Sequence, residues 1–127
     1  MMHNPSGRQY ADELMHRLRK IGSVEVKRFF GGYGLVHAGV QFAFVMKGSL
    51  FFYVNDQTRD QYIQQHSQAF SYSTKSKQVI VNSYFEVPAS PLESDTELIE
   101  WAIAAIEAAR ANKIKKTSRR SNPIIHS

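Results

Sequence analysis

The 127-residue chain contains no cysteine and no long apolar run. The missing cysteines exclude disulfide bonds, thiol nucleophiles and thiolate metal sites. No segment approaches the roughly 20 apolar residues of a membrane-spanning helix, and the polar start MMHNPSGRQY lacks the apolar region of a secretory signal. These absences predict a soluble, cytoplasmic protein without a membrane partner.

Positive and negative charges balance until the end of the chain. The formal net charge is +5, yet residues 1–110 hold eleven Lys or Arg and eleven Asp or Glu. The whole excess comes from the C-terminal segment, as Lys113, Lys115, Lys116, Arg119 and Arg120. We therefore predict a neutral domain in residues 1–110 and a basic tail in residues 111–127 that is frayed and disordered beyond Asn112.

The basic tail has two interpretations. Its five cationic side chains favour weak, nonspecific contact with DNA phosphates, because contact with the backbone gives affinity without reading sequence. Lysines near the C-terminus of a helix are also favourable without any partner, so a solvated tail is the alternative.

Apolar spacing predicts three helices. An amphipathic helix is expected at residues 10–21, with Gly22 ending it. A short helix is expected at 58–66, opened by a capping box of Thr58 and Gln61. A final helix begins near Ser94, whose capping partner is Glu97, and its apolar stripe consists of Leu98, Trp101, Ala102, Ala105, Ile106 and Ala109.

Alternating apolar residues and turn signals predict the strands. They are expected at 23–30, in a three-strand meander within 28–56, at 69–73 and at 78–87, with turns at 37–39 and 47–49. With 43% apolar residues, the chain suits a single core. The order of elements predicts an α+β fold in two layers, a mainly antiparallel sheet with three helices on one face.

Two separated segments carry a family resemblance. The first is RFFGGYGLVHAGVQFAFVMKGSLFFYVND at 28–56, and the second is YFEVPASPLESDTELIEWAIAAIEAA at 84–109. Together they resemble the N-terminal domain of the TfoX/Sxy family of competence regulators, over residues 8–110. The signature positions are Phe30, Gly31, Gly32, Tyr33, Gly34, Tyr84, Val87 and Pro88.

The resemblance implies the same two-layer architecture and no established catalytic residues. In that family the full-length regulators act with the cAMP receptor protein on competence promoters and carry a second, helical C-terminal domain. Residues 111–127 are too few for such a domain, so we expect a stand-alone copy of the N-terminal domain. The implied partners are the cAMP receptor protein or RNA polymerase.

No residue pattern predicts catalysis, a cofactor or a metal. A phosphate-binding loop precedes a helix, but a predicted strand follows Gly31, Gly32 and Gly34. We therefore expect these glycines to permit positive φ angles or close chain approach. His16, His37 and His66 lie on different predicted elements. Asp56 and Asp60 have the spacing of ordinary surface charges, and no serine-nucleophile motif occurs.

The aromatic residues of the meander have alternative roles. Phe42, Phe44, Phe51, Phe52 and Tyr53 could stack on single-stranded nucleic acid, but only Lys47 accompanies them within residues 40–54, which favours core packing. Phe51 and Tyr53 point away from the core-facing residues and could form an exposed or dimerising patch.

These observations predict a non-enzymatic regulatory or interaction domain. The alternatives are a homo-oligomerising structural module, which would be a homodimer, and a small-molecule-binding domain with a pocket beside Gly31 to Gly34 and His37.

Overall fold

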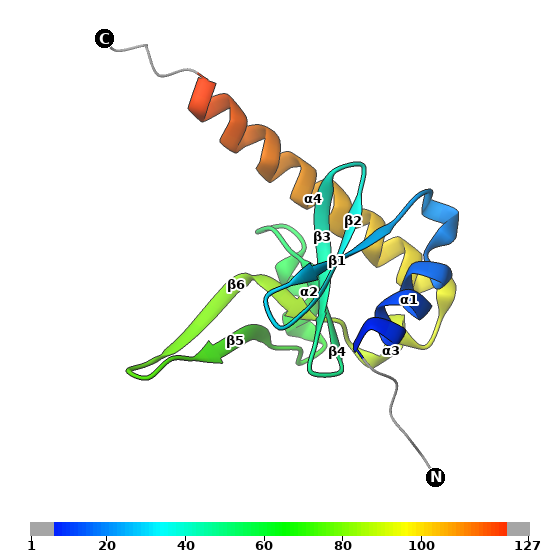
Figure 1. Cartoon of the computed structure of the whole chain (residues 1–127), viewed down its shortest axis with the longest axis horizontal. Coiled ribbons are helices and arrows are strands. Elements are labelled where there is room, and N and C mark those ends of the chain that lie inside the picture. Colours follow the sequence, from blue (N-terminus) through cyan, green and yellow to red (C-terminus); the bar gives the residue numbers. More distant parts are fainter. Residues whose placement is uncertain (1–6, 122–127) are drawn as a thin grey trace.

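The computed structural model describes residues 7–121, and side chains through Lys115. Six strands form one antiparallel sheet in the order β1-β2-β3-β4-β6-β5 (Figure 1). The elements are α1 (Gly7–Arg17), η1 (Arg19–Ile21), β1 (Glu25–Phe29), β2 (Gly32–His37), β3 (Val40–Met46), β4 (Ser49–Tyr53), α2 (Arg59–Gln64), β5 (Ala69–Ser73), β6 (Gln78–Glu86), α3 (Ala89–Leu92) and α4 (Asp95–Ser121). The predicted α+β class and mainly antiparallel sheet are confirmed.

Short hairpin turns join the first four strands. At the β2–β3 turn Ala38 and Gly39 have φ angles of 51° and 78°, and at the β3–β4 turn Lys47 and Gly48 have 52° and 82°. Positive φ at both central residues gives the twist that two-residue hairpins need. The turns predicted at 37–39 and 47–49 are therefore confirmed.

The core lies between the helices and one face of the sheet. Leu14 of α1, Tyr62 of α2 and Leu98 of α4 belong to one buried cluster with side chains of the central strands. Those strand residues include Leu35, Phe42, Ala43, Val45, Leu50, Phe52 and Phe85. Because consecutive side chains of a strand alternate between faces, most residues next to these in sequence point to the opposite face of the sheet.

A bulge interrupts this alternation in β3. Leu35 pairs with Ala43, but the next residue of β2, Val36, pairs with Gln41, so Phe42 has no partner on β2. Phe42 and Ala43 consequently both belong to the core cluster although they are neighbours in sequence.

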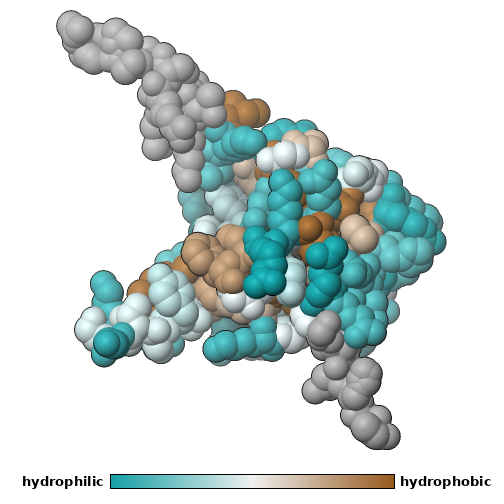
Figure 2. Space-filling view, viewed as in Figure 1, coloured by the Kyte–Doolittle hydropathy of each residue, from teal (hydrophilic) through white to brown (hydrophobic). Residues whose placement is uncertain are grey.

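The β5–β6 hairpin projects from the body of the molecule (Figures 1 and 2). Its base is held by pairing of β6 with β4, from Phe51 and Glu86 to Tyr53 and Tyr84. The outer half of the hairpin, from Ser71 to Gln78, is exposed to solvent.

Four α-helices are present in residues 7–121, rather than the three predicted. The additional helix is α3, a single turn that contains Pro91. Proline is tolerated there because the N–H groups of a first helical turn have no partner within the helix.

Helix α4 also continues beyond the predicted end. It runs to Ser121, whereas the sequence favoured an end near Asn112, and the fraying of the tail stays a prediction. Lys and Arg have good helix propensity, and extending an existing helix costs much less than starting one.

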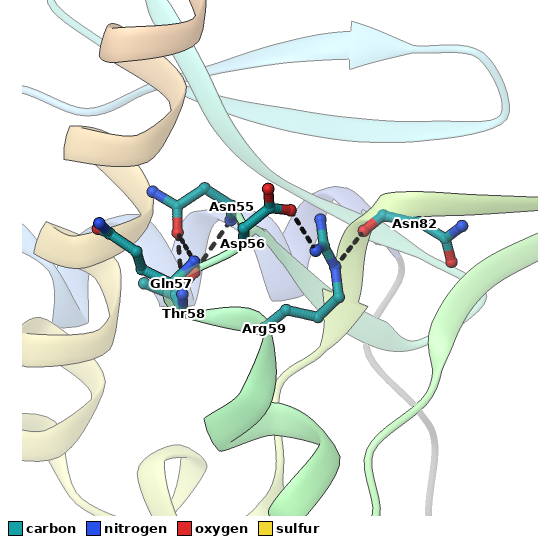
Figure 3. Close-up of polar contacts among 6 residues, drawn as sticks. All are labelled: Asn55, Asp56, Gln57, Thr58, Arg59 and Asn82. Carbon is teal, nitrogen blue, oxygen red and sulfur yellow. Dashed lines mark hydrogen bonds and ion pairs between the residues drawn. The ribbon is translucent and has the colours of Figure 1, made fainter.

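The capping predictions have mixed outcomes. Ser94 caps α4 as predicted, because its Oγ accepts a hydrogen bond from the Glu97 N–H at 3.2 Å. Thr58 does not cap α2 with its side chain. Instead Asn55 Oδ1 accepts from the Thr58 N–H and Thr58 Oγ1 accepts from the Asn55 N–H, at 2.9 and 3.0 Å (Figure 3). This is a reciprocal capping box that begins three residues earlier than predicted.

Candidate functional site

An aromatic pocket occupies the sheet face that the helices leave open. It encloses about 490 Å³ between the β1–β2 turn, β3 and the β5–β6 hairpin. We call it the aromatic pocket, and its lining is Phe29, Phe30, Phe44, Met46, Phe70, Tyr72, Val81 and Tyr84. Figure 2 shows apolar surface beside the base of the hairpin. A concave site of this size and composition is typical of binding pockets.

Phe44 forms the centre of the pocket floor. Strand alternation places it opposite the core residues Ala43 and Val45, and it is only 1% exposed. Other rings surround it on the same face, with centroids at 4.7 Å for Tyr84 and 5.0 Å for Phe70. Phe51 stacks on Phe44 at 5.1 Å and is 9% exposed, so the prediction of an exposed patch at Phe51 is wrong.

Phe30 forms the rim of the pocket. It lies in the turn between β1 and β2 with a φ of 51° and is 85% exposed. A left-handed conformation costs an L-residue about 1–2 kcal/mol, and bulky side chains rarely adopt it. The ring contacts Phe29 edge-to-face at 4.8 Å. Across the pocket, Tyr72 is 48% exposed.

Of the three signature glycines, Gly32 serves close chain approach, one of the two roles predicted, and Gly34 lies against a side chain. A Cβ at Gly32 would lie 2.1 Å from the Val45 carbonyl oxygen, and one at Gly34 would lie 2.6 Å from Gln41 Oε1. Gly31 has neither a positive φ nor an atom within 4 Å of its Cβ position. Nothing in the structure explains glycine at that position.

Three of the other signature residues have structural roles, and the fourth lines the aromatic pocket. Tyr33 lies beneath the guanidinium groups of Arg8 and Arg28, at 6.0 and 5.7 Å from the ring centroid. Val87 is buried, and its N–H donates to the Leu50 carbonyl at 2.8 Å. Pro88 precedes α3. Tyr84 lines the aromatic pocket.

A second, more polar hollow lies behind Tyr84. It encloses about 590 Å³ between the β2–β3 turn, the sheet and α4, and its lining includes Gln41, Tyr53, Asn112 and Lys113. Burial raises the pKa of Tyr84 to about 12, while a hydrogen bond with Gln41 opposes the rise. Burial also raises the pKa of Tyr53, and the nearby Arg59 charge opposes this.

The structure describes the side chains of two of the five predicted DNA-contacting residues, Lys113 and Lys115. Lys113 Nζ donates a hydrogen bond to the Gly39 carbonyl oxygen at 3.0 Å, across the polar hollow. Lys115 is exposed on α4. The side chains of Lys116, Arg119 and Arg120 lie outside those that the structure describes.

The predicted histidines and carboxylates do not converge. The His37 ring contacts the Ser23 carbonyl through Nδ1 at 2.8 Å, away from the aromatic pocket. Asp56 forms an ion pair with Arg59 at 2.7 Å (Figure 3), and this bond lowers the pKa of Asp56. Within residues 7–121 no group of three or more His, Asp or Glu is placed to hold a metal ion.

The helices of residues 7–121 include none with the length and apolar character to cross a membrane. The fold and the site define a class: a small two-layer α+β domain with an aromatic pocket on its open sheet face. The family model of the TfoX N-terminal domain matches residues 16–109, and the chain belongs to this family. The family is not a known enzyme family. No curated protein matches the chain.

Sequence reasoning missed the pocket. Phe70 and Tyr72 carried no signal beyond strand alternation, and they reach the pocket only because β5 pairs with β6, which in turn pairs with β4. The available signals were Phe44, which belongs to the aromatic cluster of the meander, and Phe30, a bulky residue at a signature position directly before two glycines.

Proposed function

We propose that this protein is a non-enzymatic regulatory domain that binds another protein through the aromatic pocket. The observation that carries the proposal is Phe30, a bulky side chain that is 85% exposed in a strained backbone conformation. Because the Phe30 side chain is so exposed, packing in the core of the domain does not explain a phenylalanine at this position. Strain of this kind is concentrated at functional sites, and exposed aromatic residues beside a pocket are frequent anchors of protein interfaces.

Family membership supports the choice of partner. Regulators with this N-terminal domain act with the cAMP receptor protein, so we propose that protein, or RNA polymerase, as the binding partner. The proposal also places the chain in the cytoplasm, where it would contribute to regulating transcription of competence genes.

The test is direct binding of the purified chain to each candidate partner by biolayer interferometry. We expect one of them to bind, and we expect Phe30→Asn to weaken binding at least about tenfold, equivalent to about 1.4 kcal/mol. Asn suits the left-handed turn position, so thermal melting should show that this variant folds as stably as the parent.

Ile80→Thr is the matched control, because Ile80 is 61% exposed on β6 but does not line the aromatic pocket. Equal affinity of the parent and Phe30→Asn would show that the pocket is not the site. Absence of binding to both candidates would remove them as partners.

A further inference from the structure

We infer that the aromatic pocket receives a bulky apolar side chain from an acidic segment of its protein partner. This inference rests on the proposed function and adds the chemistry of the partner. It is drawn from the charges around the pocket, the exposure of its rim and the packing of its rings.

Lysines surround the pocket. Lys47 follows the lining residue Met46, and Lys27 precedes the lining residue Phe29 by two positions, which places it on the same face of β1. Lys75 and Lys77 form the tip of the β5–β6 hairpin beyond Tyr72. All four are exposed.

The acidic residues of this face are fewer. Glu25 lies 3.8 Å from Lys27 in an exposed ion pair, and Glu86 lies on β6 opposite Phe51. The four lysines therefore exceed the two carboxylates, and the surface around the pocket carries net positive charge. Such a surface favours an acidic partner segment and speeds its association.

A second copy of the chain fits this face poorly. A twofold contact would place the same patch of both copies together, so the lysines around one pocket would meet those around the other. Repulsion between like charges at an interface costs free energy, which disfavours the homodimer considered from the sequence at this face.

The exposed rim indicates a partner larger than a free small molecule. A ligand contained in the pocket would touch only the side of Phe30 that faces the pocket, and would leave much of this side chain, which is 85% exposed, in solvent. A polypeptide segment that inserts one side chain can cover Phe30 and Tyr72 with its flanking residues. The exposed apolar rim is thereby removed from water.

The packing of the rings favours a side chain over a nucleic-acid base. Phe70 meets Phe44 and Phe51 at interplanar angles of 83° and 78°, and Phe44 is 1% exposed. Base stacking needs open ring faces, which the pocket floor does not offer. An aliphatic or aromatic side chain can contact ring edges equally well.

The experiment measures binding of fluorescein-labelled peptides to the full chain by fluorescence anisotropy. The first peptide has one Trp flanked on both sides by Asp and Glu. A second has Ala in place of Trp, and a third has Asn and Gln in place of Asp and Glu. A labelled oligothymidine tests the nucleic-acid alternative.

We expect the acidic Trp peptide to bind. The peptide without Trp should bind at least about tenfold more weakly because it lacks the anchor side chain. The peptide without charge should bind at least about tenfold more weakly because it lacks attraction to the lysines. Phe30→Asn and Lys75→Glu/Lys77→Glu should each weaken binding similarly. Ile80→Thr and the charge-matched Lys20→Glu/Lys115→Glu should retain it, because these residues lie outside the pocket and its surrounding lysines.

Failure of the acidic Trp peptide to bind, or equal binding to Phe30→Asn, would overturn the inference. Binding of oligothymidine in its place, weakened by Phe30→Asn, would assign the pocket to single-stranded nucleic acid. Peptide binding together with no binding of the cAMP receptor protein or RNA polymerase would retain the pocket chemistry and reject only those partners.

Discussion

At the scale of single residues, Tyr84 connects the two hollows of the molecule, since it lines both the aromatic pocket and the polar hollow behind it. Burial raises its pKa to about 12 from the ordinary tyrosine value of 10.0. Below the pKa of the unfolded chain both states are neutral and the full stability is present. As the pH rises toward the folded-state pKa, the unfolded chain ionises first and stability is lost.

Tyr84→Phe should therefore reduce the alkaline loss of stability. Two pKa units correspond to about 2.7 kcal/mol, and partial exposure of the side chain reduces the expected effect to about 1–2 kcal/mol between about pH 9 and pH 12. Urea unfolding of the parent and the variant across this range measures it, and phenolate absorbance gives the titration independently. Equal pH dependence of the two proteins would contradict the role assigned to Tyr84.

Phe30 shows what sequence reasoning can and cannot identify at this scale. The sequence identified Phe30 as a signature position, because an aromatic residue directly before two glycines is visible in the sequence itself. Its exposure and its positive φ were not predictable, because both depend on the hairpin in which Phe29 pairs with Gly32. Gly32 is similar, since its need for a missing Cβ arises from the Val45 carbonyl oxygen on the neighbouring strand.

At the scale of elements, α2 depends on the capping box that precedes it. Asn55 Oδ1 accepts hydrogen bonds from the N–H groups of Gln57 and Thr58, both at 2.9 Å (Figure 3). Arg59 then joins the start of the helix to β6 through the Asn82 carbonyl at 3.2 Å. The cap thus orients the helix that places Tyr62 in the core.

Asn55→Ala should lower the free energy of unfolding by about 1 kcal/mol, the usual effect of removing a helix cap. Gln57→Ala is the matched control, because Gln57 is exposed and contributes its backbone N–H to the box. Urea unfolding with both variants measures the difference. If Asn55→Ala matched Gln57→Ala, the box would not stabilise the helix.

Strands and turns were predictable where local signals set them. The turns at 37–39 and 47–49 have glycine at a position of positive φ, and Ser94 has a cap's spacing to Glu97. The error at Thr58 arose because Asn55 and Thr58 also have cap spacing, and the sequence alone does not decide between two overlapping boxes. The bulge at Phe42 places two neighbouring residues of β3 in the core, which strand alternation does not predict.

At the scale of the whole molecule, charge divides into a neutral domain and a basic C-terminal segment. The domain boundary at residue 110 stays a prediction, but α4 crosses it without a break (Figure 1). Lys113 lies beyond that boundary and still contacts the domain through the Gly39 carbonyl. Lys113 therefore belongs with the folded domain, and four cationic side chains remain beyond it.

These four side chains set the expected strength of DNA binding. If Lys113 keeps its contact, the slope of log K against log salt should be about −3.6, a loss of about 150-fold between 50 and 200 mM salt, whereas five phosphate contacts would give about −4.5. Fluorescence anisotropy with duplex DNA measures the slope. Lys113→Gln should leave it unchanged, Lys115→Gln should reduce its magnitude by about 0.9, and scrambling the DNA sequence should have little effect.

Deletion of residues 114–127 should abolish binding. Sequence-selective binding that survives this deletion would move the DNA-binding surface to the lysines around the aromatic pocket, where Lys27, Lys75 and Lys77 would be the first residues to change.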